Sequence, residues 1–237
     1  LMTRPYKACN YIEFDNKKYL YLNDDSPVLA YQNSDVAFVA QPLPHPSNQF
    51  KVIPVPLMMT DEWDIIKDNP QVINDIRTHG IKNRAFDFSF VGQCQYVGRE
   101  VFRNINLNNY DFEETSPVYH LSKDEKKKKL VDFLYRISTS RFTFAPRGVG
   151  SSSFRAYQAM MVGSIPIITE MNDYPFKNEV DWDSICIRGD LRDLVSLVQK
   201  AISMSKEEYD VMRNGAMSFW DKYCKHDNLF NKLKELV

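Results

Sequence analysis

The sequence predicts an α/β protein whose parallel sheet is covered by helices on both faces. From residue 86 onward, short apolar strand-like runs alternate with segments whose apolar residues recur at helical spacing. This alternation is typical of parallel sheets, because each helix connects one strand to the next. The chain has 237 residues, 43% hydrophobic and 26% charged, so it can bury a large core without disulfides or metals.

Residues 1 to about 80 predict a different, strand-rich region. Apolar runs at residues 18–22, 36–40 and 50–56 are bounded by Asp, Asn and Pro, as strands often are. A short helix is predicted at residues 70–80, with Pro70 in its first turn and Gly80 beyond its end.

The second region reads in order as strands and capped helices. We expect strands at residues 86–92, 141–146, 164–169 and 184–187. We expect helices at residues 96–105, 122–138, 153–162, 190–203 and 205–224. Ser122 with Glu125, and Ser205 with Glu208, match the capping-box spacing, and Asp190 is a further N-cap candidate.

Charge and cysteine content exclude several classes of protein. Lys and Arg number 30 against 31 Asp and Glu, so no global positive field favours nucleic acid as a partner. The four cysteines are widely spaced, which argues against zinc and suits a reducing compartment: Cys9, Cys94, Cys186 and Cys224. No run of about 18 apolar residues or signal peptide is visible. We expect a soluble cytoplasmic protein, or a Golgi-lumenal one if an upstream anchor has been removed.

The turn between the strand at 141–146 and the helix at 153–162 carries the strongest functional pattern. Gly148 and Gly150 allow a tight backbone turn with room for a ligand. Serines 151–153 add hydroxyl donors at a helix N-terminus, where the macrodipole favours an anion. Arg147 and Arg155 flank the turn with guanidinium groups suited to phosphate. The pattern predicts a phosphate or diphosphate site; the alternative is a capped helix with both arginines in surface ion pairs.

Three kinds of phosphate site compete for this turn. A P-loop is excluded because the turn has no Lys. A GxGxxG dinucleotide site would have Ser153 in place of the third Gly, but Glu170 stands where a ribose-binding acid belongs. An NAD(P)-dependent oxidoreductase therefore remains open. The third kind is a nucleotide-sugar site, in which a diphosphate meets a helix N-terminus and an Arg.

A set of short motifs resembles exostosin-type glycosyltransferases (glycosyltransferase family 47). The set comprises FSFVG followed by Arg99, then Pro146-Arg147-Gly148, Ser153-Phe154-Arg155, Gly163, Pro166-Ile167, Pro175-Phe176 and Trp182. Order and spacing are similar to the donor-binding half of that family over residues 88–220. Because the chain is short for the family, we expect a compact viral or microbial member.

The resemblance implies a GT-B-like fold of two Rossmann-like halves with parallel sheets, the N-terminal half being reduced. Residues 1–82 would form the acceptor side and residues 83–237 the nucleotide-sugar side, with the final helix packing back on the first half. The implied reaction is an inverting transfer from a nucleotide sugar, such as UDP-xylose or another UDP-sugar, to a glycan or glycoprotein. It implies no cofactor and neither Mn²⁺ nor Mg²⁺.

The resemblance also implies which residues bind the donor. Arg99, Arg147 and Arg155 would stabilise the leaving diphosphate together with backbone N–H groups at the turn. The remaining donor-binding candidates are Gly148, Ser151, Ser152, Ser153, Gln158 and Glu170. Gln158 replaces a Glu that the family usually carries, and it would still hydrogen-bond the donor ribose. That departure leaves a non-catalytic glycan-binding module as a further alternative.

An inverting transfer also needs a base to deprotonate the acceptor hydroxyl. The candidates in the N-terminal region are Asp24, Asp25, Asp35, His45 and Asp61. We favour Asp24 and Asp25 because they follow the strand at 18–22, although such residues often only cap turns. Asp181 and Asp183 match the DxD pattern of metal-dependent transferases, but the resemblance explains this stretch through Trp182 without a metal.

Overall fold

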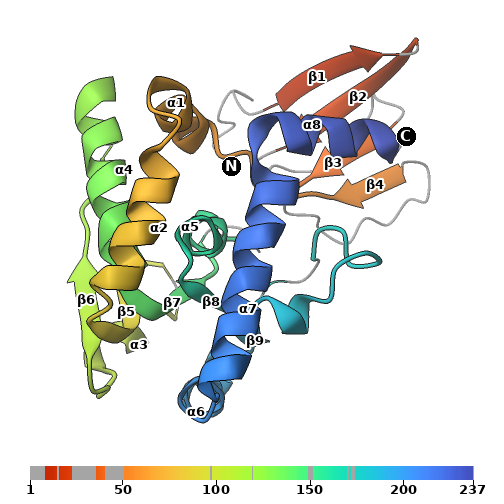
Figure 1. Cartoon of the computed structure of the whole chain (residues 1–237). Helices are drawn as coiled ribbons and strands as arrows, with labels where there is room; N and C mark the ends of the chain where they lie inside the picture. Colours follow the sequence, from red (N-terminus) through yellow and green to blue (C-terminus); the bar gives the residue numbers. More distant parts are fainter. Residues whose placement is uncertain are drawn as a thin grey trace.

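The chain folds into two sheets with helices around them, as Figure 1 shows. This is a computed structural model of the whole chain, and it describes residues 9–14, 16–22, 36–40, 51–96, 98–118, 120–148, 152–169, 171 and 174–236. The first sheet has four strands and the second has five. The predicted α/β class with parallel strand pairing is confirmed, and the GT-B-like arrangement with a reduced N-terminal half stays a prediction.

The first sheet combines a hairpin with a parallel ladder. Its strands, in the order β1-β2-β3-β4, are β1 (Cys9–Phe14), β2 (Lys17–Leu22), β3 (Val36–Val39) and β4 (Lys51–Pro54). β1 and β2 pair antiparallel, whereas β2, β3 and β4 pair parallel. The sequence pattern did not predict β1. Tyr21 is fully buried, and its hydroxyl donates to the carbonyl of Pro56 at 2.6 Å, which ties the sheet to the following segment.

The second sheet is wholly parallel, in the order β6-β5-β7-β8-β9. Its strands are β5 (Phe86–Gly92), β6 (Tyr110–Glu114), β7 (Ser140–Pro146), β8 (Ile165–Thr169) and β9 (Ile187–Gly189). Pro146 at the end of β7 pairs with Thr169 at the end of β8, so the strands end along a common edge. We call this the carboxyl edge, the place where parallel sheets bind ligands.

Helices cover both faces of this sheet. The α-helices are α1 (Thr60–Asp68), α2 (Val72–Lys82), α3 (Val101–Asn104), α4 (Lys123–Ser138), α5 (Phe154–Val162), α6 (Leu194–Ile202), α7 (Lys206–Phe219) and α8 (His226–Glu235). Shorter turns are η2 (Trp182–Ser184), η3 (Leu191–Asp193) and the π-helical η4 (Trp220–Cys224). Both predicted capping boxes are present at α4 and α7, and Asp190 caps η3.

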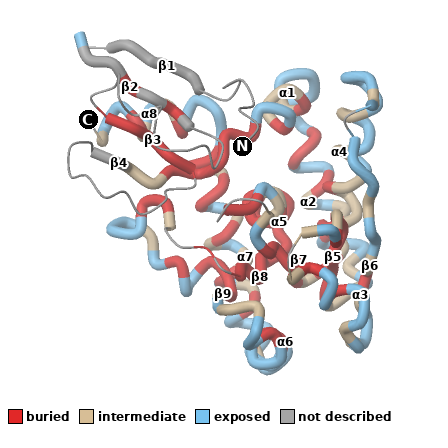
Figure 2. The backbone as a smooth tube through the Cα atoms, turned by 180° about the vertical axis from the view of Figure 1, so that it is seen from behind, coloured by how far each residue is buried: buried red, intermediate tan, exposed pale blue. Residues whose placement is uncertain are grey.

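Two apolar cores lie on opposite faces of the second sheet, and Figure 2 shows the buried interior. One core packs Phe88, Phe90 and Phe144 against α3 and α6. The other runs from Tyr19 and Phe38 of the first sheet through α2, α4 and α5 to Leu229 of α8. α1 and α2 pack against α4, and α2 also packs against α5. The division between residues 82 and 83 stays a prediction.

Two predicted elements differ from the observed ones. The helix predicted at 96–105 is only α3, because residues 98–100 form a turn in which Gly98 has a φ of +83°. The strand predicted at 184–187 is wrong, because the amides of Ile185 and Cys186 both turn back to the carbonyl of Trp182. The strand β9 therefore begins at Ile187.

Gly80 also has a different role from the predicted helix stop. It lies buried inside α2, and a Cβ there would fall 2.4 Å from the carbonyl oxygen of Ser138 at the end of α4. Glycine therefore permits two helices to approach closely. The prediction failed because a helix contact and a helix end favour the same residue.

Candidate functional site

The helix α5 buries all its residues except those on one side. Phe154 is exposed and Arg155 and Gln158 are intermediate, whereas the other six residues of the helix are buried. Positions three and four apart lie on one helical face, so these three side chains share it. We call them the open face of α5. The helix begins just beyond the end of β7, and its N-cap Ser153 makes no side-chain capping bond. The N-terminus of α5 therefore suits an anion from outside the helix.

Arg155 lies under the end of β5. Its Nε donates to the carbonyl of Val91 at 3.0 Å, and its guanidinium lies 4.8 Å from the ring centre of Phe90. A Cβ on Gly92 would come within 1.9 Å of Nη2, so only glycine leaves room for this arginine. Nη1 is buried and has no hydrogen-bond partner in the described structure. Burial, and then the charge of Arg99, lowers the pKa of Arg155 to about 9.

Arg99 holds the ends of β5 and β7 together. Its Nε donates to the carbonyl of Arg147 at 2.9 Å, and Nη2 donates to the carbonyl of Pro146 at 3.0 Å. Its Nη1 donates to the carbonyl of Gln93 at 3.2 Å. Burial lowers the pKa of Arg99. The side chain thus sets the backbone at the start of the Gly/Ser turn and adds positive charge beside Arg155.

These two guanidinium groups have no carboxylate partner. Neither Arg99 nor Arg155 forms a hydrogen bond or ion pair with an Asp or Glu of the described residues. An unpaired buried charge is costly, so an incoming anion would relieve an existing penalty. Together with the uncapped N-terminus of α5, they form a site of the right charge and donor set for a diphosphate.

The structure brings most predicted donor-binding residues to this place. Arg147 is exposed just after β7, Gly148 follows it, and Ser152 and Ser153 are buried at the start of α5. The hydroxyl of Ser152 lies 3.4 Å from that of Tyr157. Several further predicted site residues lie outside the described residues: Asp24, Asp25, Asp35, His45, Ser151 and Glu170. Their roles stay predictions.

One residue that sequence reasoning missed reaches the open face from α1. The Nε2 of Gln158 donates to Oε1 of Glu62 at 2.6 Å. Glu62 is only 4% exposed, whereas the neighbouring base candidate Asp61 is exposed. Burial raises the pKa of Glu62, and the hydrogen bond from Gln158 opposes that rise. Glu62 lies three residues before Ile65, and this spacing indicates that both face the buried side of a helix. The pattern could be recognised only if α1 had first been predicted.

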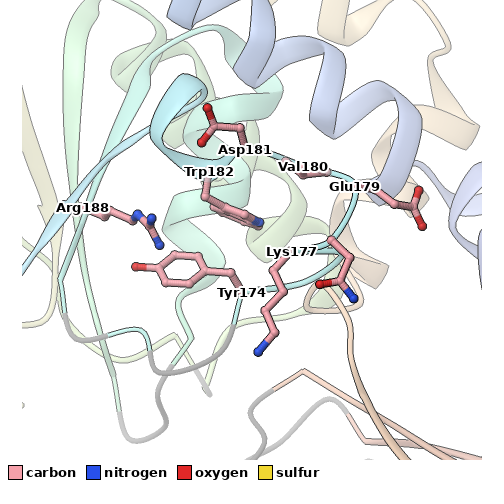
Figure 3. Close-up of a pocket in the computed structure, with 8 residues that line it drawn as sticks. Tyr174, Lys177, Glu179, Val180, Asp181, Trp182 and Arg188 are labelled. Atoms are coloured by element: carbon pink, nitrogen blue, oxygen red, sulfur yellow. The ribbon is translucent and has the colours of Figure 1, made fainter.

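A pocket of about 500 Å³ lies further along the carboxyl edge, beyond β8 and β9 (Figure 3). Its lining residues are Tyr174, Lys177, Asn178, Glu179, Val180, Asp181, Trp182 and Arg188. Figure 3 shows the Tyr174 ring directed toward Arg188, whose guanidinium lies 4.7 Å from the ring centre. Neither Arg99 nor Arg155 lines this pocket. The pocket offers room for other parts of a ligand bound at the same edge.

The two acids of the DxD pattern make local contacts beside this pocket. Asp183 binds Arg188 through two hydrogen bonds of 2.7 Å. Asp181 accepts from the amide of Asp183 at 3.0 Å and so caps η2. These contacts explain the DWD stretch as a structural turn. Across the described ranges, no three His, Cys, Asp or Glu side chains gather in a metal-binding arrangement.

None of the helices that the structure describes combines the length and the apolar character needed to cross a bilayer.

Solved structures and curated proteins offer distant likenesses. An alpha-glucosyltransferase in complex with UDP and mismatched 13-mer DNA aligns with 92% of this chain and 70% of its own, at 13% identity and a TM-score of 0.41. Exostosin-1 homolog of Caenorhabditis elegans is 29% identical over 90 residues, which is 38% of this chain and 24% of that protein. Exostosin-1 of Drosophila melanogaster is 28% identical over 102 residues, which is 42% of this chain and 13% of that protein.

The family comparison reaches further along the chain. Exostosin-1b of Danio rerio is 24% identical over 102 residues, but the match spans only 14% of that protein. The chain thus matches a quarter or less of the length of these curated relatives. The model of the Exostosin GT47 domain matches residues 36–204, well over half of the chain, and includes both arginines and α5. The chain therefore belongs to the Exostosin GT47 domain family, a family of glycosyltransferases.

Proposed function

We propose that this chain transfers a sugar from a nucleotide-sugar donor, most simply a UDP-sugar, to a glycan hydroxyl. The observation that carries the proposal is that buried Arg99 and the buried Nη1 of Arg155 have no carboxylate partner among the described residues, beside the uncapped N-terminus of α5. A donor diphosphate supplies the two negative charges that this place lacks. Family membership supports the same ligand class.

The chemistry that this site would promote is departure of the nucleoside diphosphate. The bond between the anomeric carbon and the diphosphate oxygen breaks, and the oxygen keeps the electron pair. Arg155 and the backbone amides at the start of α5 stabilise the developing charge. Arg99 fixes the backbone at the start of the turn that leads into α5. In an inverting transfer the acceptor oxygen attacks the opposite side of that carbon and passes its proton to a base. We retain Asp24 or Asp25 as the base in this proposal, and no metal is assigned a step.

Thermal shift with a ligand panel tests the proposal directly. UDP at about 100 times its Kd should stabilise the fold by about 2.7 kcal/mol, a rise in Tm of about 5–10 °C for a chain of this size. A subsequent assay should detect UDP release from a UDP-sugar in the presence of a glycan acceptor. Stabilisation by NAD⁺ but not UDP would instead identify a dinucleotide site. Stabilisation by glycans alone would identify a binding module.

A further inference from the structure

We propose that Glu62 is a positioning residue that fixes the amide of Gln158, so that Gln158 presents its carbonyl oxygen to a ribose hydroxyl of the bound nucleotide. The ligand identity rests on the proposed function. The arrangement itself rests on the 2.6 Å contact between Gln158 Nε2 and Glu62 Oε1, and on the place of Gln158 in the open face of α5.

The hydrogen-bonding capacity of the two groups determines the orientation of the amide. An ionised carboxylate only accepts, so the Gln158 atom that meets Glu62 must be the N–H donor. The amide oxygen then lies on the other side of the planar group, away from Glu62. No second hydrogen bond to Gln158 is formed within the described residues. Its oxygen is therefore available to accept from a ligand hydroxyl.

The place of Gln158 brings that oxygen into the diphosphate site. Gln158 lies three residues after Arg155, so both side chains leave α5 on the same side. Every residue of α5 outside the open face is buried, which leaves a ligand no other side chain of this helix to contact. In a nucleoside diphosphate the ribose is attached directly to the phosphate, so a group one helical turn from Arg155 is well placed for its hydroxyls.

Glu62 is suited to hold the amide because it is itself immobilised. It lies in the first turn of α1, where the helix macrodipole favours a carboxylate. It is almost completely buried, so it cannot reach an acceptor hydroxyl and serve as the base. Its action on the ligand therefore passes through Gln158.

The charges around Glu62 determine how its hydrogen bond with Gln158 responds to pH. Burial raises the pKa of Glu62 and the charge of Asp61 adds to that rise, while Lys123 and Lys127 of α4 pair with Asp64 and Asp68 of α1. When Glu62 is protonated, its O–H donates to the Gln158 oxygen and the amide must turn round. Gln158 then presents N–H groups, and recognition of a hydroxyl as donor is lost as the pH falls through the raised pKa of Glu62.

The test compares four probes: UDP, 2′-deoxy-UDP, 3′-deoxy-UDP and inorganic pyrophosphate. Wild-type protein should bind UDP about tenfold more tightly than at least one deoxy analogue, the value of one well-placed hydrogen bond. In Glu62→Gln the ratio of UDP affinity to deoxy-analogue affinity should fall to about twofold or less. The new amide can donate or accept, so it no longer fixes the orientation of the Gln158 amide. Pyrophosphate affinity should not change, because it depends on the arginines.

Two further variants separate positioning from general damage. Asp64→Asn makes the same charge change on α1 and should keep the wild-type ratio. The double variant Glu62→Gln with Gln158→Glu exchanges the two partners and should restore the ratio, since residue 158 again presents an oxygen. The wild-type ratio should fall in acid, whereas that of Glu62→Gln should be flat.

Each outcome addresses one of the two proposals. If wild-type protein bound neither pyrophosphate nor UDP, the diphosphate site itself would be wrong. If the arginine site bound both but Glu62→Gln kept the full ratio and the wild-type pH profile, Glu62 would have no positioning role. An equal loss in Asp64→Asn would reduce the effect to surface charge and overturn the inference.

Discussion

The two edges of the second sheet use arginine in opposite ways. At the amino edge, Arg136 of α4 makes two hydrogen bonds of 2.7 and 2.6 Å to Asp111 near the start of β6. Arg141 of β7 pairs at 3.3 Å with Asp87 of β5. Each of these guanidinium groups meets a carboxylate from a neighbouring element.

At the carboxyl edge, Arg99 and Arg155 donate to backbone carbonyl groups and meet no carboxylate of the described residues, and burial lowers the pKa of each. By contrast, the hydrogen bonds that Arg136 donates to Asp111 raise the pKa of Arg136. Arginine therefore stabilises the fold at one edge, and at the other edge it leaves positive charge without a neutralising carboxylate. Uncompensated positive charge lowers the stability of the fold, and binding of an anion explains why these arginines are kept.

The strongest test of this contrast is Arg155→Gln. It removes a guanidinium that has no carboxylate partner among the described residues, so UDP binding should weaken by at least about 100-fold. The melting temperature without ligand should change little, because the lost charge had no carboxylate partner. Calorimetric titration and thermal melting measure the two effects separately. A variant that binds UDP normally would contradict the proposed site.

The matched change at the other edge is Arg136→Gln, and its effect should be reversed. Asp111 would lose two charged hydrogen bonds, so we expect unfolding free energy to fall by about 1–3 kcal/mol. UDP affinity of the folded protein should be unchanged. Urea denaturation with and without UDP measures both quantities. Weakened UDP binding in this variant would show that the two edges are not independent.

Gly92→Ala sharpens the contrast by moving Arg155 without removing its charge. The added methyl would fall 1.9 Å from Nη2, so the guanidinium must shift away. We expect UDP to bind about tenfold more weakly, a smaller loss than in Arg155→Gln, because displaced charge still attracts the diphosphate. Affinity measured at low and high salt would reveal this residual attraction. Equal losses in the two variants would argue against a positional effect.

The smallest effect concerns the pH dependence of UDP affinity. The pKa of Arg155 is lowered to about 9, and the charged form binds the diphosphate. Affinity should therefore be constant between about pH 7 and 8, where the terminal phosphate is ionised, and fall, up to about tenfold per unit, as the pH rises above 9. The phosphates of UDP are already fully ionised there. Arg155→Gln should lack this alkaline decline; its persistence would assign the titration to another group.

Local patterns predicted much of the second half. The capping boxes at Ser122 and Ser205 are confirmed, because a cap depends on residues only three apart. The strand before the Gly/Ser turn and the helix after it are likewise confirmed, and the comparisons confirm the family. By contrast, β6 and α1 were missed, since their burial depends on partners distant in sequence.

The sequence by itself determined the parallel half of the fold, its cationic turn and the family, because each follows from residue types at short, fixed spacing. Only the tertiary structure decided which charges are neutralised. Glu62 meets Gln158 across 96 residues of chain, and Arg155 reaches the carbonyl of Val91 across 64. No local pattern encodes such pairs, because packing of separate elements places them and burial then sets their charge.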